Sequence, residues 1–438
     1  MQLLTVGDKV KKLRKSKKIT QMSLAAYIGA KVDTIVYVES GRGEYSPKHI
    51  EAIMELFNIT GMPLDESDRP AFVRRLYLWR ACIIDRQMDE AKKMRVELSR
   101  VLNLEPCDYD LTMLYRLFDV HMTLVEGNRS EAESKFAFIK DNVHTLSDEH
   151  LYHYYHIEGS VIFYQKRYEE CLKHFLKACD LIEGNNRLLP EYDKSVVKLF
   201  HIIAWCYSYI EIPGRAIIFY RKTKEAYTDD IRKNAGLQMD TELAHNLIKM
   251  NELKMAEKLL SESLIKAQSI NDNHSIGLVM STFGDLNKKS GEYKEAISCY
   301  EQALKCFQEG SEFYLSSLYK KIHCYIDARE FPKAQRILEP ARIKYGSDKN
   351  WLIYLEALRH YLIVSRRMST RNKESSEYIE NVAIPKLEER YNYFYVLDFC
   401  KLLERHYEET KSHMNSLQMS KKIRDIYERC FIYTERKI

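Results

Sequence analysis

Small residues recur in this chain at nearly regular intervals, and this spacing constrains the fold more than any other feature. Seven of them lie 38 to 45 residues apart, at Ala91, Ala132, Cys171, Ala216, Ala256, Ala296 and Ala334. Most are followed by a large residue at the fourth position and a small one at the seventh, as in Ala296, Tyr300 and Ala303. These positions share one face of a helix, so the pattern predicts a closely packed helix that recurs along the chain.

The clearest copy of the pattern, GDLNKKSGEYKEAISCYEQAL, places Gly284 in a first helix and Gly291 in the turn before a second. This order matches the tetratricopeptide repeat, a helical hairpin of about 34 residues, here with an extension in each unit. One hairpin cannot bury its apolar face alone, so consecutive hairpins stack. We therefore expect an all-α fold: seven clear units, a loose eighth near Ser376 and a closing segment over about 389–438, wound into a right-handed superhelix.

The composition agrees with a helical, soluble protein. Gly (15) and Pro (9) are sparse in 438 residues, and no run of about 18 apolar residues is long enough to span a membrane. The first residues, MQLLTVGDKVKKLRK, lack the apolar core of a signal peptide. The ten cysteines include no CxxC pair, so we interpret them as reduced thiols in a cytoplasmic protein.

The positive charge of the chain is concentrated at its N-terminus. Residues 1–49 contain ten Lys and Arg against four Asp and Glu, a net charge of +6, whereas the remaining 58 basic and 59 acidic residues nearly cancel. A basic block within one small domain favours an anionic partner such as nucleic acid.

The same N-terminal region reads as a series of short helices. Thr20 is a suitable N-cap for a helix that ends at Gly29, a further helix spans about 32–40, and Ser46 with Pro47 opens another. Two short helices joined at a glycine turn and flanked by packing helices describe a helix-turn-helix. The stretch TGMPLDESDRP (60–70) reads as a linker, so we predict a DNA-binding domain over 1–66 and a repeat domain over 67–438.

The stretch TQMSLAAYIG…TIVYVESGRGEYSP resembles the repressor-type helix-turn-helix of the Xre/434-repressor family over about 60 residues. The resemblance implies that the third helix enters the major groove and that Gln21 touches phosphate. Val36 and Tyr37 stand where the family often has Ser or Gln and Arg, and Val32 offers only apolar contact to a thymine methyl, so base reading is expected to be modest. The DNA-binding residues that we predict are Lys11, Lys12, Arg14, Lys15, Gln21, Lys31, Val32, Asp33, Thr34, Tyr37 and Arg42.

Histidine is over-represented on the inner face of the predicted repeats. With 14 His in the chain, about one is expected by chance among the helix positions that line the groove of such arrays, but six fall there: His121, His153, His156, His201, His245 and His323. An extended peptide needs donors along the wall that binds it, and aromatic residues supply rigid contact area. The alternative is that these histidines and tyrosines only fill space between helices.

We predict a peptide-binding groove formed by His156, His201, Trp205, Tyr209, His245, Lys249, Asp285, Lys288, Tyr319 and His323. Because lysines outnumber aspartates in this set and its surroundings, the peptide is expected to carry an acidic residue or a free C-terminal carboxylate. No third ligand accompanies His153 and His156, so no metal site is predicted. The chain contains no Walker loop, HExxH, GxSxG or dinucleotide fingerprint, and we predict neither a cofactor nor an enzymatic activity.

A repressor-type helix-turn-helix followed by tetratricopeptide-like units resembles the Rap/Rgg–NprR–PlcR–PrgX family of peptide-pheromone receptors, and the length is most similar to the NprR branch. The resemblance implies a cytoplasmic quorum-sensing transcription regulator. Its implied partners are double-stranded DNA, a short signalling peptide, further copies of itself in a dimer or tetramer, and in some members a response regulator.

Two alternatives to this reading remain open. One is a phage-encoded peptide receptor that governs lysis and lysogeny. The other is a protein-interaction scaffold or phosphatase regulator in which the helix-turn-helix no longer reads DNA.

Overall fold

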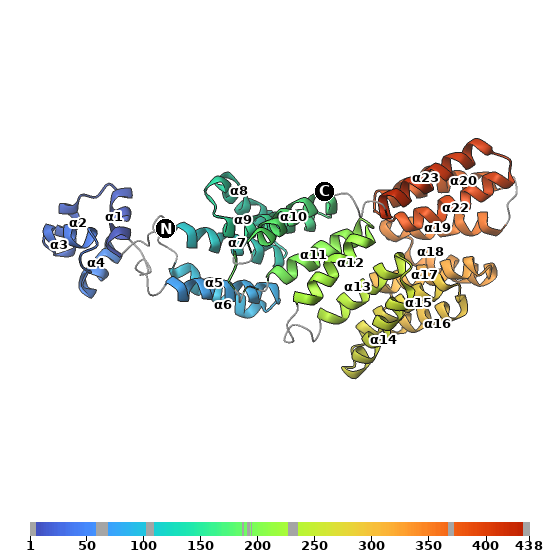
Figure 1. The fold of residues 1–438 in the computed structure, drawn as a ribbon, viewed down its shortest axis with the longest axis horizontal. Helices are drawn as coiled ribbons and strands as arrows, with labels where there is room; N and C mark the ends of the chain where they lie inside the picture. Colours follow the sequence, from blue (N-terminus) through green and yellow to red (C-terminus); the bar gives the residue numbers. More distant parts are fainter. Residues whose placement is uncertain are drawn as a thin grey trace. The chain divides into compact units, whose positions relative to one another are not determined.

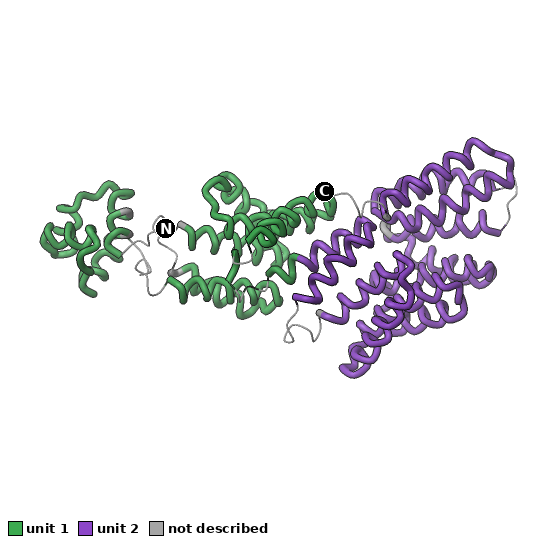
Figure 2. Tube along the Cα trace, viewed as in Figure 1, with its two compact units in different colours: residues 1–199 green, residues 200–438 purple. Residues whose placement is uncertain are grey.

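The computed structural model describes residues 6–57, 69–101, 109–185, 188–190, 193, 195–226, 235–366 and 372–431. All regular secondary structure in these residues is helical, which confirms the predicted all-α class (Figure 1). The chain divides into two compact units, residues 1–199 and 200–438 (Figure 2). None of the described helices combines the length and apolar character that a membrane span requires.

Unit 1 begins with the four helices of the N-terminal module: α1 (Val6–Ser16), α2 (Gln21–Ile28), α3 (Val32–Glu39) and α4 (Pro47–Phe57). The predicted local signals act as expected. The Thr20 side chain accepts a hydrogen bond from the Ser23 N–H at the start of α2, and Gly29 ends that helix in the left-handed conformation with φ 68°. The expected linker is shorter at its end, because Pro70 already lies in the first turn of α5. The predicted boundary after residue 66 lies outside the described residues.

Three helical hairpins follow in unit 1. Their elements are α5 (Arg69–Ile84), α6 (Met88–Val101), α7 (Tyr109–Val125), α8 (Arg129–Asp141), the 3-10 turn η1 (Val143–Thr145), α9 (Asp148–Tyr164) and α10 (Tyr168–Gly184). The predicted small residues explain how the two helices of a hairpin approach each other. At Gly159 in α9, an added Cβ would lie 2.6 Å from the Phe175 ring of α10, so the aromatic residue occupies the space that the glycine leaves.

Unit 2 contains the remaining hairpins, and α11 crosses from unit 1 into it. Its helices are α11 (Ser195–Tyr209), α12 (Pro213–Ala226), α13 (Ala235–Lys249), α14 (Leu253–Ser269), α15 (Asn273–Ser290), α16 (Tyr293–Cys306), α17 (Glu312–Asp327), α18 (Phe331–Tyr345), α19 (Lys349–Arg366), α20 (Lys373–Tyr378), the π-helical turn η4 (Ile379–Ala383), α21 (Ile384–Glu388), α22 (Tyr393–Glu409) and α23 (His413–Phe431). The loose eighth unit is α19 with α20 to α21, where Ser376 is buried, and α22 with α23 forms the closing hairpin.

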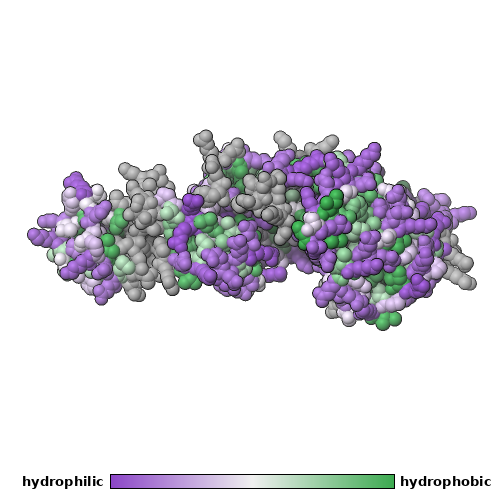
Figure 3. Space-filling model, turned by 90° about the horizontal axis from the view of Figure 1, so that it is seen from below, coloured by the Kyte–Doolittle hydropathy of each residue, from purple (hydrophilic) through white to green (hydrophobic). Residues whose placement is uncertain are grey.

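The seven small residues that define the repeat register are all buried in the contacts between helices, with no exposed surface. Conversely, the outer surface is polar: in the view of Figure 3, hydrophilic residues cover most of the described surface and apolar residues appear in separate smaller areas. The repeat spacing therefore identified residues that hold the fold together, and functional residues have to be sought elsewhere.

Candidate functional site

The first candidate site is the exposed face of α3 in the N-terminal module. The core of the module is formed by buried apolar residues of all four helices, among them Val10, Leu24, Ile35 and Ile53. On the opposite face of α3, large apolar side chains point to solvent: Val32 is 41% exposed, Val36 47% and Tyr37 54%. The fold of the module does not require apolar residues there, so this face is suited to contact a partner.

Polar members of the predicted DNA-binding set surround the same face. Lys31, Asp33 and Arg42 are exposed and Thr34 is half-buried, while Lys15 is exposed at the end of α1. The side chain of Lys12 lies outside the described residues. The structure therefore places most of the predicted set where a ligand could reach it.

Arg14 differs from the expectation, because it belongs to the core of the module. Its side chain is 8% exposed, and its guanidinium binds both carboxylate oxygens of Glu39, with Nε–Oε1 at 2.7 Å and Nη2–Oε2 at 2.8 Å. The Gln21 side chain also donates to the Glu39 carboxylate, and the Lys11 ammonium donates to the backbone carbonyl of Glu39. A bidentate pair of this kind fixes α1 against α3. Sequence reasoning missed Glu39 as this anchor, and Arg14 is a structural residue here.

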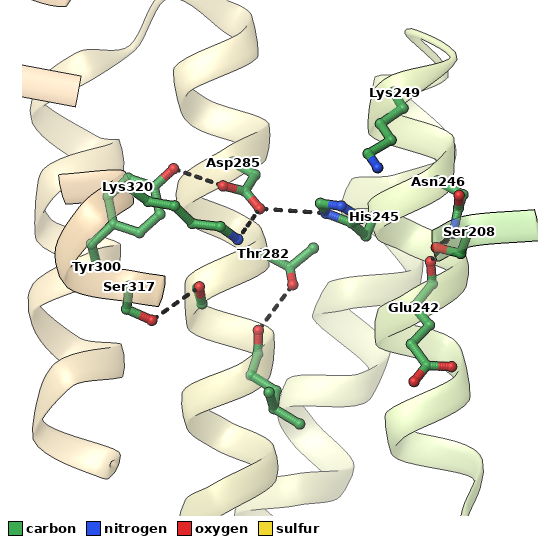
Figure 4. A network of polar contacts seen from close by, with 12 residues as sticks. Ser208, Glu242, His245, Asn246, Lys249, Thr282, Asp285, Tyr300, Ser317 and Lys320 are labelled. Carbon is green, nitrogen blue, oxygen red and sulfur yellow. Dashed lines mark hydrogen bonds and ion pairs between the residues drawn. The ribbon is translucent and has the colours of Figure 1, made fainter. Parts of the chain in front are cut away.

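The second candidate site is the inner face of unit 2, where the first helices of successive hairpins lie side by side. Asp285 of α15 is its centre (Figure 4). It accepts hydrogen bonds from Tyr300 at 2.8 Å and from Lys320 at 2.6 Å, and His245 of α13 lies 3.4 Å away. Burial raises the pKa of Asp285, but Lys320 and then His245 outweigh this and hold it well below its ordinary value. Burial and the charge of Lys249 lower the pKa of His245 to about 4, despite Asp285.

A second ionic contact of this face involves Lys249 of α13. Its ammonium lies 3.1 Å from Glu211, a residue of the turn between α11 and α12, and 4.7 Å from the centre of the Phe394 ring. Glu211 in turn accepts a 2.7 Å hydrogen bond from the backbone N–H of Phe394 at the start of α22. Burial raises the pKa of Glu211, and Lys249 opposes the shift. These contacts join α13 and the turn after α11 to the start of α22.

The third ionic contact is formed by Lys288, which lies 2.9 Å from Asp327 and also contacts His323. Burial lowers the pKa of Lys288, but Asp327 and Asp398 outweigh this and raise it above its usual value. His323 is 1% exposed, and its ring lies 4.9 Å from that of Tyr361. The ring of Tyr319, 2% exposed, packs edge-on against Tyr395 of α22.

The remaining predicted members in unit 2 lie near the start of the same face. His201 lies 3.2 Å from Glu242, which also accepts from Tyr220. The rings of Trp205 and Tyr209 are 5.5 Å apart, and Tyr209 is 41% exposed. The structure therefore brings nine of the ten predicted groove residues into one unit, while His156 lies in unit 1.

The expected surplus of lysine on this face is not supported. The sequence-based count considered only Asp285 and Asp327, whereas Glu211 pairs with Lys249, Glu242 with His201, and Asp398 raises the pKa of Lys288. Each lysine of the network has a carboxylate partner. The acidic ligand predicted from the lysine count consequently loses its basis.

Three polar atoms of the face have no hydrogen-bond partner among the described residues: Asn246 Oδ1, Tyr319 Oη and His323 Nε2. Sequence reasoning missed Asn246, which is fully buried on α13 and donates to Ser208 at 3.0 Å. The sequence did indicate it, because Asn246 is a polar residue directly after His245 on an otherwise apolar helix face. No group of three or more His, Cys, Asp or Glu side chains in the described part of the chain is arranged to hold a metal ion.

Comparison with known proteins agrees with this architecture. Residues 237–309, which span α13 to α16, match the tetratricopeptide repeat family model. The transcriptional activator NprA of Geobacillus stearothermophilus is 21% identical over 343 residues, which are 76% of this chain and 82% of that protein.

Two solved structures share the fold. The Rap protein complexed with competence and sporulation factor superposes with a TM-score of 0.65 at 16% identity, covering 82% of this chain and 99% of the other. NprR in complex with its cognate peptide NprX gives 0.61 at 18% identity, covering 81% and 99%.

These matches define the class of the protein as an all-helical tetratricopeptide-repeat protein. More narrowly, they confirm the resemblance found in the sequence: the chain has the fold of the Rap and NprR members of the Rap/Rgg–NprR–PlcR–PrgX family.

Proposed function

We propose that this protein is a transcription regulator that binds DNA through α3 of its N-terminal module and is controlled by a short peptide bound on the inner face of unit 2. The observation that carries the DNA half is the exposed row of Val32, Val36 and Tyr37, beside the exposed cations Lys31 and Arg42. Apolar and aromatic side chains meet thymine methyl groups and sugars, and the cations meet phosphate.

The peptide half is supported by the unused hydrogen-bonding capacity of unit 2. Leaving a buried donor or acceptor unpaired costs about 1–3 kcal/mol. An extended peptide presents a backbone donor and acceptor at every residue, and such groups are suited to Asn246, Tyr319 and His323. The exposed Tyr209 and its half-buried neighbour Trp205 offer apolar contact at the start of the same face.

The relatives support the same assignment. One is named as a transcriptional activator, and one solved structure contains a peptide described as cognate. Repressor-type modules read two half-sites about one helical turn apart, so the active form is expected to be at least a dimer. A response regulator remains a further partner that the resemblance implies.

DNA binding is tested by selecting a duplex from a random library with the full chain and measuring its affinity by fluorescence anisotropy. Tyr37→Ala should change the preference among selected sequences, whereas Lys31→Ala should weaken all sequences and reduce the salt dependence. Lys289→Ala, an exposed change on α15, is the matched control. If the dimeric full chain selects no sequence and binds no duplex at low salt, the scaffold alternative replaces this proposal.

A further inference from the structure

A separate polar cluster lies in the interior of unit 1, formed by residues of α5, α7 and α9. Its centre is Arg80 of α5, which has no exposed surface. The Nη2 of Arg80 lies 3.0 Å from Nδ1 of His156, and the guanidinium lies 4.7 Å from the centre of the Phe118 ring. His153 packs against the same Phe118 ring, and the His121 ring lies 6.3 Å from that of His156.

Arg80 differs from every other interior cation described above, because its own hydrogen bonds reach no carboxylate. Its Nε and Nη1 are buried and have no hydrogen-bond partner among the described residues. Arginine does not lose its proton in proteins, so the charge remains. A buried charge without a counter-charge is strongly unfavourable.

The neighbouring histidines do not supply the missing charge. Burial, and then the charge of Arg80, lower the pKa of His121 to about 3 and hold the pKa values of His153 and His156 well below the usual range, so all three rings are neutral. Glu149 accepts a hydrogen bond from Tyr77 and Asp193 accepts one from Ser195, and neither carboxylate forms a hydrogen bond or ion pair with Arg80 among the described residues.

Two further nitrogen atoms of the cluster are also unpartnered among the described residues, the Nδ1 atoms of His121 and His153. In the described part of the chain, Arg80 Nε and Nη1 are free donors around this permanent cation. His153 Nδ1 is an acceptor in the neutral ring, because its Nε2 donates to Tyr77, whose hydroxyl donates to Glu149, so it is suited to a protonated oxygen of a ligand. His121 is half-buried, whereas Arg80, His153 and His156 are buried, so a ligand would enter beside His121.

We propose that Arg80, His121, His153 and His156 form a binding site for a small oxyanion, a carboxylate or a phosphate group. A guanidinium binds such groups through parallel charged hydrogen bonds, which are about twice as strong as neutral ones. A spherical anion does not match this planar donor set. The site lies in unit 1 and does not depend on the proposed peptide groove of unit 2, so either can fail alone.

The test is the melting temperature of the full chain, titrated with sodium phosphate or sodium acetate in HEPES buffer, with sodium chloride keeping the ionic strength constant. We expect the melting temperature of unit 1 to rise saturably with at least one oxyanion. A response to phosphate alone would assign a phosphate group, and a response to acetate would assign a carboxylate. No response beyond that of sodium chloride alone would overturn the proposal.

Three variants make the test specific. Arg80→Gln should abolish the saturable response, and Arg80→Lys should weaken the apparent affinity by about tenfold, because a lysine cannot donate in parallel. Arg74→Gln, an exposed change on the same helix, should leave the response intact. A saturable response that persists in Arg80→Gln would contradict the assignment. If Arg80→Gln does not fold, the proposal is still tested by the weaker response expected of Arg80→Lys and by the comparison of oxyanion with chloride in the wild-type protein.

Discussion

Arg80 of unit 1 and the paired lysines of unit 2 are stabilised in opposite ways. In unit 2, Lys249, Lys288 and Lys320 each pair with a carboxylate from a neighbouring element at 2.6 to 3.1 Å. In unit 1, Arg80 is more deeply buried than any of them and contacts a neutral histidine and an aromatic ring. Both units are built from the same hairpin, so the repeat does not dictate this difference.

This difference predicts that removing a charge should have opposite effects at Arg80 and at the paired residues of unit 2. Removing one partner of a buried ion pair leaves the other charge uncompensated. Removing a buried cation that forms no ion pair relieves the protein of an unfavourable burial. The following predictions test this contrast, beginning with the largest expected effect.

Asp285→Asn should destabilise unit 2 by about 3–5 kcal/mol, because Lys320 then stays in the interior without its carboxylate. The free energy of unfolding, measured with urea, provides the value. The double variant Asp285→Asn/Lys320→Met should recover part of the loss. A loss below about 1 kcal/mol would show that this network is no stronger than a surface ion pair.

Arg80→Met is the matched change in unit 1. It should leave stability unchanged or raise it when no oxyanion is added, because the long apolar side chain fills the same space without a charge. Urea unfolding under the same conditions gives the comparison. A loss as large as that of Asp285→Asn would remove the distinction between the units.

Acid should destabilise unit 1 through its three interior histidines. The folded pKa values of His121, His153 and His156 lie below the unfolded value of 6.5, so the unfolded chain binds more protons and stability falls as the pH drops below about 6.5. Each histidine that is protonated only in the unfolded chain lowers the free energy of unfolding by about 1.4 kcal/mol for each pH unit of acidification. Three of them together lower it by about 4 kcal/mol per pH unit. Trp79, buried in unit 1, reports this transition when Trp205 and Trp351 of unit 2 are replaced by Phe. Burial also lowers the pKa values of four histidines of unit 2, so that unit should lose stability in acid as well: His245, His323, His360 and His406. A stability of unit 1 that stays constant as the pH falls below about 6.5 would contradict the prediction.

Packing should not distinguish the units. Ala132→Leu in unit 1 and Ala296→Leu in unit 2 both force a larger side chain into a contact with no exposed surface, and each should cost about 1–3 kcal/mol. Thermal unfolding of the two variants gives the comparison. If one variant is tolerated and the other is not, the repeats are not equivalent in packing, and the contrast in charge is not the main difference between them.

Tyr37→Ala should have the smallest effect on stability, within about 0.5 kcal/mol, because the ring is 54% exposed on α3. Its effect should appear only in DNA binding. A clear loss of stability would mean that the exposed face of α3 is covered within the folded protein and is not a DNA surface.

Features that depend on local sequence were predicted well. The cap at Thr20, the left-handed Gly29 and the small residue at Gly284, where an added Cβ would meet the Tyr300 ring, follow from the backbone and from contacts within one hairpin. The polar networks could not be predicted, because they join positions that are distant in the sequence. For example, Glu211 accepts a hydrogen bond from the backbone N–H of Phe394, which is 183 residues away. The apolar stripe around Arg80 did hold a signal, since Leu76 and Ile83 on the same face are buried, but its meaning depended on α7 and α9.

The most direct test of the proposed function is the affinity of the full chain for its selected duplex, measured with and without a saturating peptide chosen by the protein from a library of short synthetic peptides. We expect the peptide to change the affinity for DNA by about tenfold or more, equivalent to about 1.4 kcal/mol of coupling. Trp205→Ala should weaken the binding of this peptide and leave DNA binding in the absence of peptide unchanged. An affinity for DNA that is the same at every peptide concentration would contradict the proposed function.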